Sequence, residues 1–173
     1  MKIALLGFSA SGKSTLAKWL AQTYQLPLLH LDTIQFTANW QDRPLEEGQA
    51  MVKEFMSQDS WVIDGNYRKF FQAERLEEAD MIIFMNFPVY RALPRAIKRY
   101  ISFHGKTRSD MADDCIEKLD WTFMKWILKD GRTPMIKDHY KSLQQTYPEK
   151  WIELTSQKDI NAFMTQIEQK ENG

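Results

Sequence analysis

The chain has 173 residues, enough for one domain with a hydrophobic core, and its 43% hydrophobic and 27% charged residues are usual for a globular protein. Lys and Arg number 23, as do Asp and Glu, so the zero net charge does not favour a nucleic-acid binder, although a local basic face stays open. With one cysteine, Cys115, and no apolar run near the roughly 20 residues of a membrane helix, we expect no internal disulfide, no membrane partner and a cytoplasmic location.

Strands and helices are predicted to alternate along the chain. Strands are expected at residues 2–6, 26–31, 61–63, 81–85 and 151–154. Helices are expected at residues 14–24, 45–58, 90–102, 114–129, 134–146 and 158–170. The alternation predicts one α/β domain over residues 1–173, with a parallel sheet, helices on both faces and ligands at the carboxyl ends of the strands.

A phosphate-binding loop is expected between the first strand and the first helix. Residues 7–14 read GFSASGKS, a complete G-x-x-x-x-G-K-[ST] pattern. Gly7 and Gly12 allow the backbone to turn so that successive N–H groups face a polyphosphate. Lys13 then reaches the β- and γ-phosphates, and the Ser14 hydroxyl can bind Mg²⁺. The residues predicted to bind ATP are Gly7, Ser9, Ala10, Ser11, Gly12, Lys13, Ser14 and Thr15.

Several short segments extend the pattern beyond this loop. They are residues 7–15, His30-Leu31-Asp32, Asn39-Trp40, residues 61–67 and residues 108–111. With these segments the chain resembles P-loop kinases of the nucleoside-monophosphate kinase type, distantly adenylate kinase, and more narrowly the small bacterial DNA topology modulation proteins. The resemblance implies a three-layer P-loop NTPase fold with a five-stranded parallel sheet in the order 2-3-1-4-5. It also implies a small lid at about residues 102–113 and the use of ATP with Mg²⁺.

The resemblance also implies roles for individual residues. Asp64, in a segment that matches the Asp-Gly-Phe-Pro-Arg of adenylate kinase, would hold Mg²⁺ together with Ser14. Arg68, from the same segment, would grip an acceptor phosphate. Arg95 and Arg99 follow Pro88 at the family's spacing, and Arg108 lies in the lid. With Lys13, these three arginines are the expected catalytic cations around the transferring phosphoryl group.

The acceptor side departs from adenylate kinase. Gln35 stands where that enzyme has an acceptor-side arginine, and Lys118 stands near the place of its second lid arginine. Asp32 has three open interpretations: a general base for a hydroxyl acceptor, an orienting group for a phosphate acceptor, or a turn residue. We therefore expect Asp32, Gln35 and Arg68 to face the acceptor, and Arg68 favours a phosphate while Asp32 with Gln35 favours a hydroxyl.

The expected activity is transfer of the γ-phosphoryl group of MgATP to a nucleotide- or nucleoside-like small molecule, by a monomer or a homodimer. A kinase of a small hydroxyl compound, such as a sugar acid, is the first alternative. A DNA-associated ATP-binding regulator is the second. It is disfavoured because Asp64 precedes Gly65, and the next strand ends in Asn86-Phe87 rather than in an acidic pair that would orient water.

Overall fold

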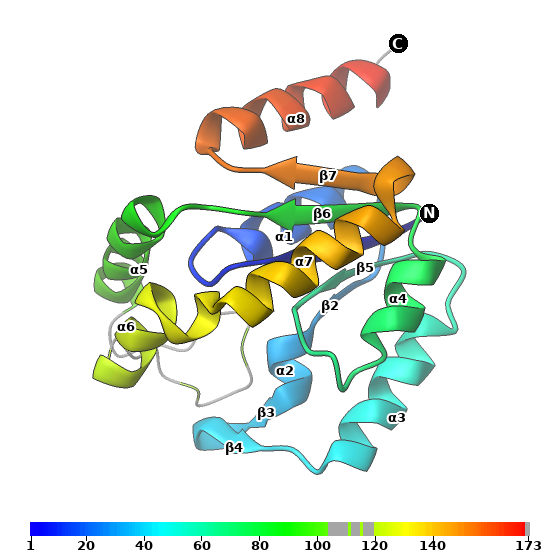
Figure 1. The fold of residues 1–173 in the computed structure, drawn as a ribbon. Coiled ribbons are helices and arrows are strands. Elements are labelled where there is room, and N and C mark those ends of the chain that lie inside the picture. Colours follow the sequence, from blue (N-terminus) through cyan, green and yellow to red (C-terminus); the bar gives the residue numbers. More distant parts are fainter. Residues whose placement is uncertain (104–110, 112–114, 116–119, 172–173) are drawn as a thin grey trace.

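The computed structural model describes residues 1–103, 111, 115 and 120–171, and its centre is a five-stranded sheet (Figure 1). The strands are β1 (Lys2–Gly7), β2 (Leu28–His30), β5 (Trp61–Asp64), β6 (Met81–Met85) and β7 (Trp151–Leu154). All neighbours pair in parallel, in the order β2-β5-β1-β6-β7. Counted among these five strands alone, this is the order 2-3-1-4-5 that the resemblance implied. The three-layer α/β fold predicted from the alternation is confirmed.

Helices cover both faces of the sheet. The apolar residues of α1 (Lys13–Thr23) and α8 (Gln157–Glu171) belong to one buried cluster. Those of α3 (Leu45–Met56), α4 (Gln72–Glu78) and α7 (Pro134–Thr146) belong to another. Two other helices, α5 (Val89–Phe103) and α6 (Trp121–Leu128), lie beyond the carboxyl ends of the strands, as Figure 1 shows.

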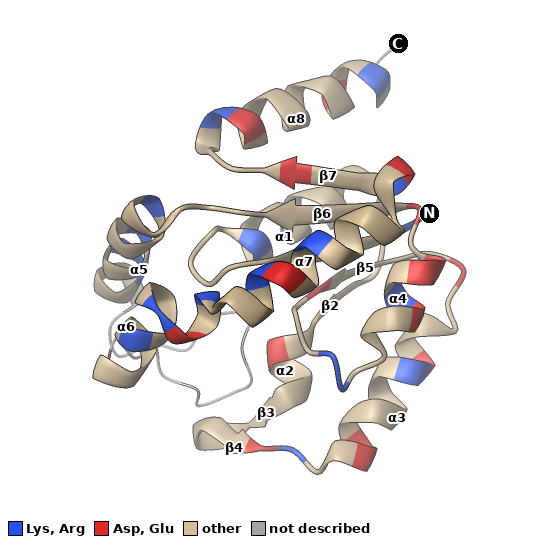
Figure 2. Cartoon of the chain, viewed as in Figure 1, with Lys and Arg blue, Asp and Glu red and all other residues tan. Residues whose placement is uncertain are grey.

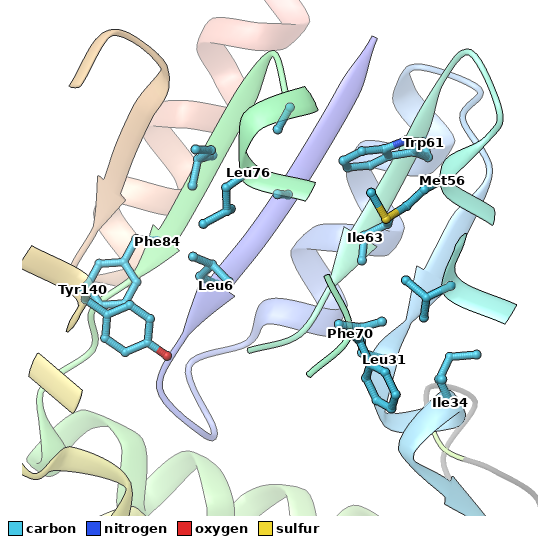
Figure 3. Packing of buried hydrophobic residues seen from close by; sticks show 14 of the residues in the cluster. Leu6, Leu31, Ile34, Met56, Trp61, Ile63, Phe70, Leu76, Phe84 and Tyr140 are labelled. Atoms are coloured by element: carbon cyan, nitrogen blue, oxygen red, sulfur yellow. The ribbon is translucent and has the colours of Figure 1, made fainter. Parts of the chain in front are cut away.

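The central strand β1 feeds both layers of the core. Successive side chains of a strand point to opposite faces, so Ile3 and Leu5 enter the cluster under α1 and α8, whereas Leu6 enters the other. The second cluster is shown in Figure 3; it includes Trp61 and Ile63 of β5, and Ile63 lies opposite Ala4 of β1 in the strand register. The central strands are therefore buried on both faces, which explains their continuous apolar sequence.

The region between β2 and α3 differs most from the sequence expectation. It contains a short helix, α2 (Leu31–Gln35), and a hairpin of β3 (Phe36–Thr37) and β4 (Gln41–Asp42). The hairpin turns at Asn39 and Trp40, whose φ angles are 59° and 62°. Asn tolerates such an angle but Trp rarely adopts it, and no glycine marks the turn, so the sequence alone did not predict this hairpin.

Two further differences concern helices. The short helix α4 was not predicted, because its seven residues are too few to show a helical period. Of the helix expected at residues 114–129, the described part begins at Trp121, with Asp120 as its N-cap. Within the described ranges, no helix is long and apolar enough to cross a membrane.

Candidate active site

The phosphate-binding loop joins β1 to α1 in a conformation that needs its two glycines. Gly7 and Gly12 have φ angles of 146° and 97°. A Cβ atom on Gly7 would lie 2.6 Å from the carbonyl oxygen of Met85 in β6. The loop backbone can therefore approach the sheet and turn inward only with glycine at this position.

Contacts from several elements hold the loop in place. The Phe8 N–H donates to the Met85 carbonyl oxygen at 3.2 Å. The Arg95 guanidinium of α5 donates to the Ser11 carbonyl oxygen at 2.6 Å, and the Trp126 indole N–H of α6 donates to the Ser9 hydroxyl at 3.2 Å. The predicted nucleotide-binding residues are thus supported by α5 and α6 as well as by the sheet.

The open end of α1 faces the loop. No side chain caps the N-terminus of this helix, and Lys13 makes no hydrogen bond or ion pair with any described residue. The Ser11 hydroxyl is buried and has no hydrogen-bond partner among the described residues. Free backbone N–H groups, a helix dipole and a lysine without a described partner are suited to binding a polyphosphate. Ser14 and Thr15 lie in the first turn of the same helix.

Asp64 ends β5 beside this loop, since Asp64 pairs with Leu5 of β1. It is buried, and its Oδ2 lies 3.1 Å from the His30 Nδ1. Its Oδ1 is also buried but has no hydrogen-bond partner among the described residues. Leaving a buried carboxylate oxygen unpaired is costly, and a metal-bound water would offset that cost.

These residues fit the Mg²⁺ that the resemblance implies. Ser14 offers a hydroxyl in the first turn of α1, and Asp64 offers its unpaired oxygen at the neighbouring strand end. The described residues contain no group of three or more His, Cys, Asp or Glu side chains suited to a metal. Mg²⁺ in kinase sites is held mainly by phosphates, water and one or two protein groups, so this pair is a sufficient protein contribution.

Asn66 is a structural link between the two halves of the site that sequence reasoning did not single out. Its Oδ1 accepts from the Gly7 N–H at 3.0 Å, and its Nδ2 donates to the Gly7 carbonyl oxygen at 2.7 Å. The side-chain amide acts as one more peptide unit beside β1, just beyond the point where β5 ends. The start of the phosphate-binding loop is thereby fixed to the segment that carries Tyr67 and Arg68.

Arg75 of α4 holds the segment of residues 65–70 that follows β5. Arg75 is fully buried, and burial lowers its pKa to about 10. Its guanidinium donates to the carbonyl oxygens of Phe70 at 2.8 Å, Tyr67 at 3.0 Å and Gly65 at 3.4 Å. The chain after β5 is consequently fixed by side-chain contacts, although it has no regular secondary structure.

Asp32 and Tyr67 meet on the acceptor side. Asp32 lies in the first turn of α2, and the Tyr67 hydroxyl donates to its Oδ1 at 2.7 Å. Burial, followed by the charge of Asp32, raises the pKa of Tyr67 well above its usual range. The phenol therefore stays a neutral hydrogen-bond donor that orients the Asp32 carboxylate.

The other predicted acceptor residues are spread around this pair. The Gln35 side chain is buried and its amide donates to Asp42 of β4. Arg68 is exposed. Burial and, to a smaller extent, the charge of Arg68 lower the pKa of His139 in α7, so Arg68 lies toward that helix. Contact of either residue with an acceptor stays a prediction.

Two of the three arginines predicted to surround the transferring phosphoryl group, Arg95 and Arg99, lie within the described residues. Arg95 stacks on the Phe87 ring with 4.6 Å between its guanidinium carbon and the ring centre. Arg99 lies over the Phe123 ring of α6 at 5.3 Å. Arg108 and Lys118 fall outside the described residues, as does most of the lid expected at residues 102–113.

Arg132 is a further cation near the loop. It ends a 3₁₀ turn (Asp130–Arg132) after α6, and its guanidinium lies 4.1 Å from the centre of the Phe8 ring. One of its terminal nitrogens is buried without a hydrogen-bond partner in the described part of the chain. Burial lowers the pKa of this group. An arginine held against the phosphate-binding loop with an unused donor is suited to an anionic ligand.

Two kinases are among the solved structures that have a fold similar to that of this chain. Shikimate kinase from Acinetobacter baumannii, in complex with shikimate, superposes with a TM-score of 0.59 and 17% identity, over 99% of this chain and 93% of that one. Deoxyadenosine kinase from M. mycoides, with bound dATP, gives a TM-score of 0.52 and 14% identity over 100% of both chains. The chain has the same fold as these two kinases.

The sequence comparisons add no closer relative. No family model matches the chain, and no curated protein matches it. Neither of the two kinases is an adenylate kinase or a DNA topology modulation protein. The fold expected of a P-loop kinase is therefore shown, and the narrower resemblance stays a prediction.

Proposed function

We propose that the protein is an ATP-dependent small-molecule kinase that transfers the γ-phosphoryl group of MgATP to a nucleotide- or nucleoside-like acceptor. The observation that carries this proposal is the phosphate-binding loop itself. Its glycine backbone lies at the carboxyl ends of β1 and β5, together with Lys13 and the buried Oδ1 of Asp64, neither of which has a hydrogen-bond partner among the described residues. In parallel sheets this is where ligands bind.

Different described residues would have different roles in phosphoryl transfer. The loop N–H groups and Lys13 would bind the β- and γ-phosphates, while Ser14 and Asp64 would hold Mg²⁺. The metal ion neutralises charge on the phosphate oxygens when it is bound. Arg95 is anchored on the loop carbonyl of Ser11 and on the Gln157 side chain at the start of α8, so it positions the loop as well as adding positive charge.

The surroundings of the loop supply cations that phosphoryl transfer needs. Transfer to a bound acceptor depends mainly on positioning and on cations around the moving group. The described cations Lys13, Arg95 and Arg132 lie in or against the loop. The two structural neighbours, both named as kinases, agree with this reading. The expected lid with Arg108 would add a further arginine and exclude water.

An ATP-consumption screen over nucleoside monophosphates, nucleosides and sugar acids would test the proposal. We expect turnover with one of these classes, and its loss in Lys13→Ala, because no other described residue places an ammonium group in the loop. Lys53→Ala, which removes an exposed lysine of α3, is the matched control and should retain full turnover. Turnover that survives Lys13→Ala would refute the mechanism, as would hydrolysis stimulated by DNA without any phosphorylated acceptor.

A further inference from the structure

Carboxylates surround the acceptor side of the site. The charges of Asp32, Asp42 and Asp64 all act on the Tyr67 hydroxyl in the direction that raises its pKa. Of the three, Asp32 accepts the hydrogen bond of this hydroxyl, and Asp42 and Asp64 act on it through their charge. Figure 2 shows acidic residues in α2 and in β4 on the same side of the molecule. Asp64 is assigned to Mg²⁺, so a phosphate group placed here would meet repulsion mainly from Asp32 and Asp42.

Two of the arginines nearest to this region are committed to the protein itself. Arg43 donates to the Ile34 carbonyl oxygen at 2.9 Å and pairs with Glu47 of α3. Arg75 is fully buried under the segment after β5, with its donors on three backbone carbonyls. Arg43 and Arg75 are therefore not available to bind an acceptor phosphate beside Tyr67.

The Asp32 carboxylate is held in a way that suits proton transfer. Its Oδ1 accepts from the Tyr67 hydroxyl at 2.7 Å, and Tyr67 packs on Phe70 with 5.7 Å between ring centres. Phe70 is itself buried in the core. The Asp32 carboxylate is therefore oriented from a rigid part of the fold, as a general base must be.

We infer that the acceptor presents a hydroxyl group rather than a phosphate, and that Asp32 takes the proton of that hydroxyl. This inference rests on the proposed kinase function and names the chemistry of its acceptor. The hydroxyl oxygen forms a bond to the γ-phosphorus, and the bond from that phosphorus to the β–γ bridging oxygen breaks. The bridging oxygen leaves with the electron pair on ADP, and the hydroxyl proton moves to the Asp32 carboxylate.

The linkage in the product tests the inference directly. Nucleosides, their 5′-monophosphates and sugar acids are each incubated with MgATP, and the products are examined by ³¹P NMR. A phosphate monoester, formed on a hydroxyl, is expected. A phosphoanhydride, formed on a monophosphate, would overturn the inference while leaving the kinase proposal intact.

A second measurement needs no known acceptor, because water can take the place of the hydroxyl. Asp32→Asn should lower the kcat of slow MgATP hydrolysis by about 10²–10⁴-fold and leave the KM for MgATP unchanged. Tyr67→Phe keeps the ring packing and removes only the hydroxyl, so it should lower kcat to a smaller extent. Asp59→Asn, in an exposed turn, is the control.

The two proposals fail in different ways in these assays. Hydrolysis that persists in Lys13→Ala would refute the kinase mechanism. Hydrolysis that requires Lys13 but is unchanged in both Asp32→Asn and Tyr67→Phe would refute the general-base role alone.

Discussion

Asn66→Asp is the sharpest test of how the two halves of the site are joined. The Asn66 amide satisfies both the N–H and the carbonyl oxygen of Gly7, at 3.0 and 2.7 Å. A carboxylate at this position has the same shape and can still accept from the N–H. It cannot donate to the carbonyl oxygen, which would then face a negative charge. The variant therefore replaces the donor NH2 group by a negatively charged oxygen in nearly the same geometry.

The size of the effect can be bounded. An unsatisfied, part-buried carbonyl oxygen costs about 1–3 kcal/mol, and repulsion by the carboxylate adds to this. The cost cannot exceed that of protonating the introduced carboxyl group, since the protonated form can donate to the carbonyl as the amide does. With an unfolded pKa of about 3.9, this ceiling is about 4 kcal/mol at pH 7 and about 1.5 kcal/mol at pH 5. We expect a loss of about 2–4 kcal/mol at pH 7.

The pH dependence follows from the direction of the shift. The native state raises the pKa of the introduced carboxyl group above its unfolded value. The penalty is therefore absent below the unfolded pKa and grows as the pH rises toward the folded pKa. Urea unfolding of wild type and variant at pH 5 and pH 7 measures the difference. Gln49→Glu, which removes an exposed amide donor to the Lys69 carbonyl, is the control. Equal stability losses of Asn66→Asp at both pH values would refute this reasoning.

Two other substitutions test neighbouring parts of the site. Gly7→Ala should lower the free energy of unfolding by at least about 2 kcal/mol, because φ is 146° and the new Cβ would lie 2.6 Å from the Met85 carbonyl oxygen; a urea midpoint equal to that of wild type would contradict this. Arg68→Ala should raise the pKa of His139 in an NMR titration, though not to its usual value, since burial is the larger cause of its lowering and Arg68 the smaller. The same variant should raise the KM for the acceptor and spare that for MgATP if Arg68 contacts the acceptor, and an unchanged acceptor KM would remove it from that site.

The sheet and the phosphate-binding loop could be predicted because their causes are local in the sequence. The central strands are buried on both faces, so they appear as continuous apolar runs such as residues 81–85. The loop depends on glycines at positions where the backbone has φ angles that other residues avoid. In both cases the residue type itself carries the structural information. The strand order came from the family resemblance rather than from these runs.

The unpredicted parts depend on contacts between distant segments. The Asn66 amide can bond to Gly7, which is 59 residues away in sequence, only because β5 ends beside β1. The β3–β4 hairpin turns through Asn39 and Trp40, neither of which is a glycine. The residue types at positions 66 and 40 do not by themselves indicate these structural roles. They become visible only when the packing of the sheet brings the partners together.

The arginines around the acceptor side show why this half of the site is harder to interpret than the donor half. The sequence pointed to Arg68 for an acceptor phosphate, and Arg43 and Arg75 are further cations of the same region. In the fold, Arg43 holds the end of α2, Arg75 is buried on backbone carbonyls, and Arg68 remains exposed near α7. The cationic charge available to an acceptor is therefore decided by packing. Packing commits Arg43 and Arg75 to the protein itself and leaves Arg68 exposed, so the inferred hydroxyl acceptor depends on the Asp32–Tyr67 pair, and phosphate binding depends on Arg68.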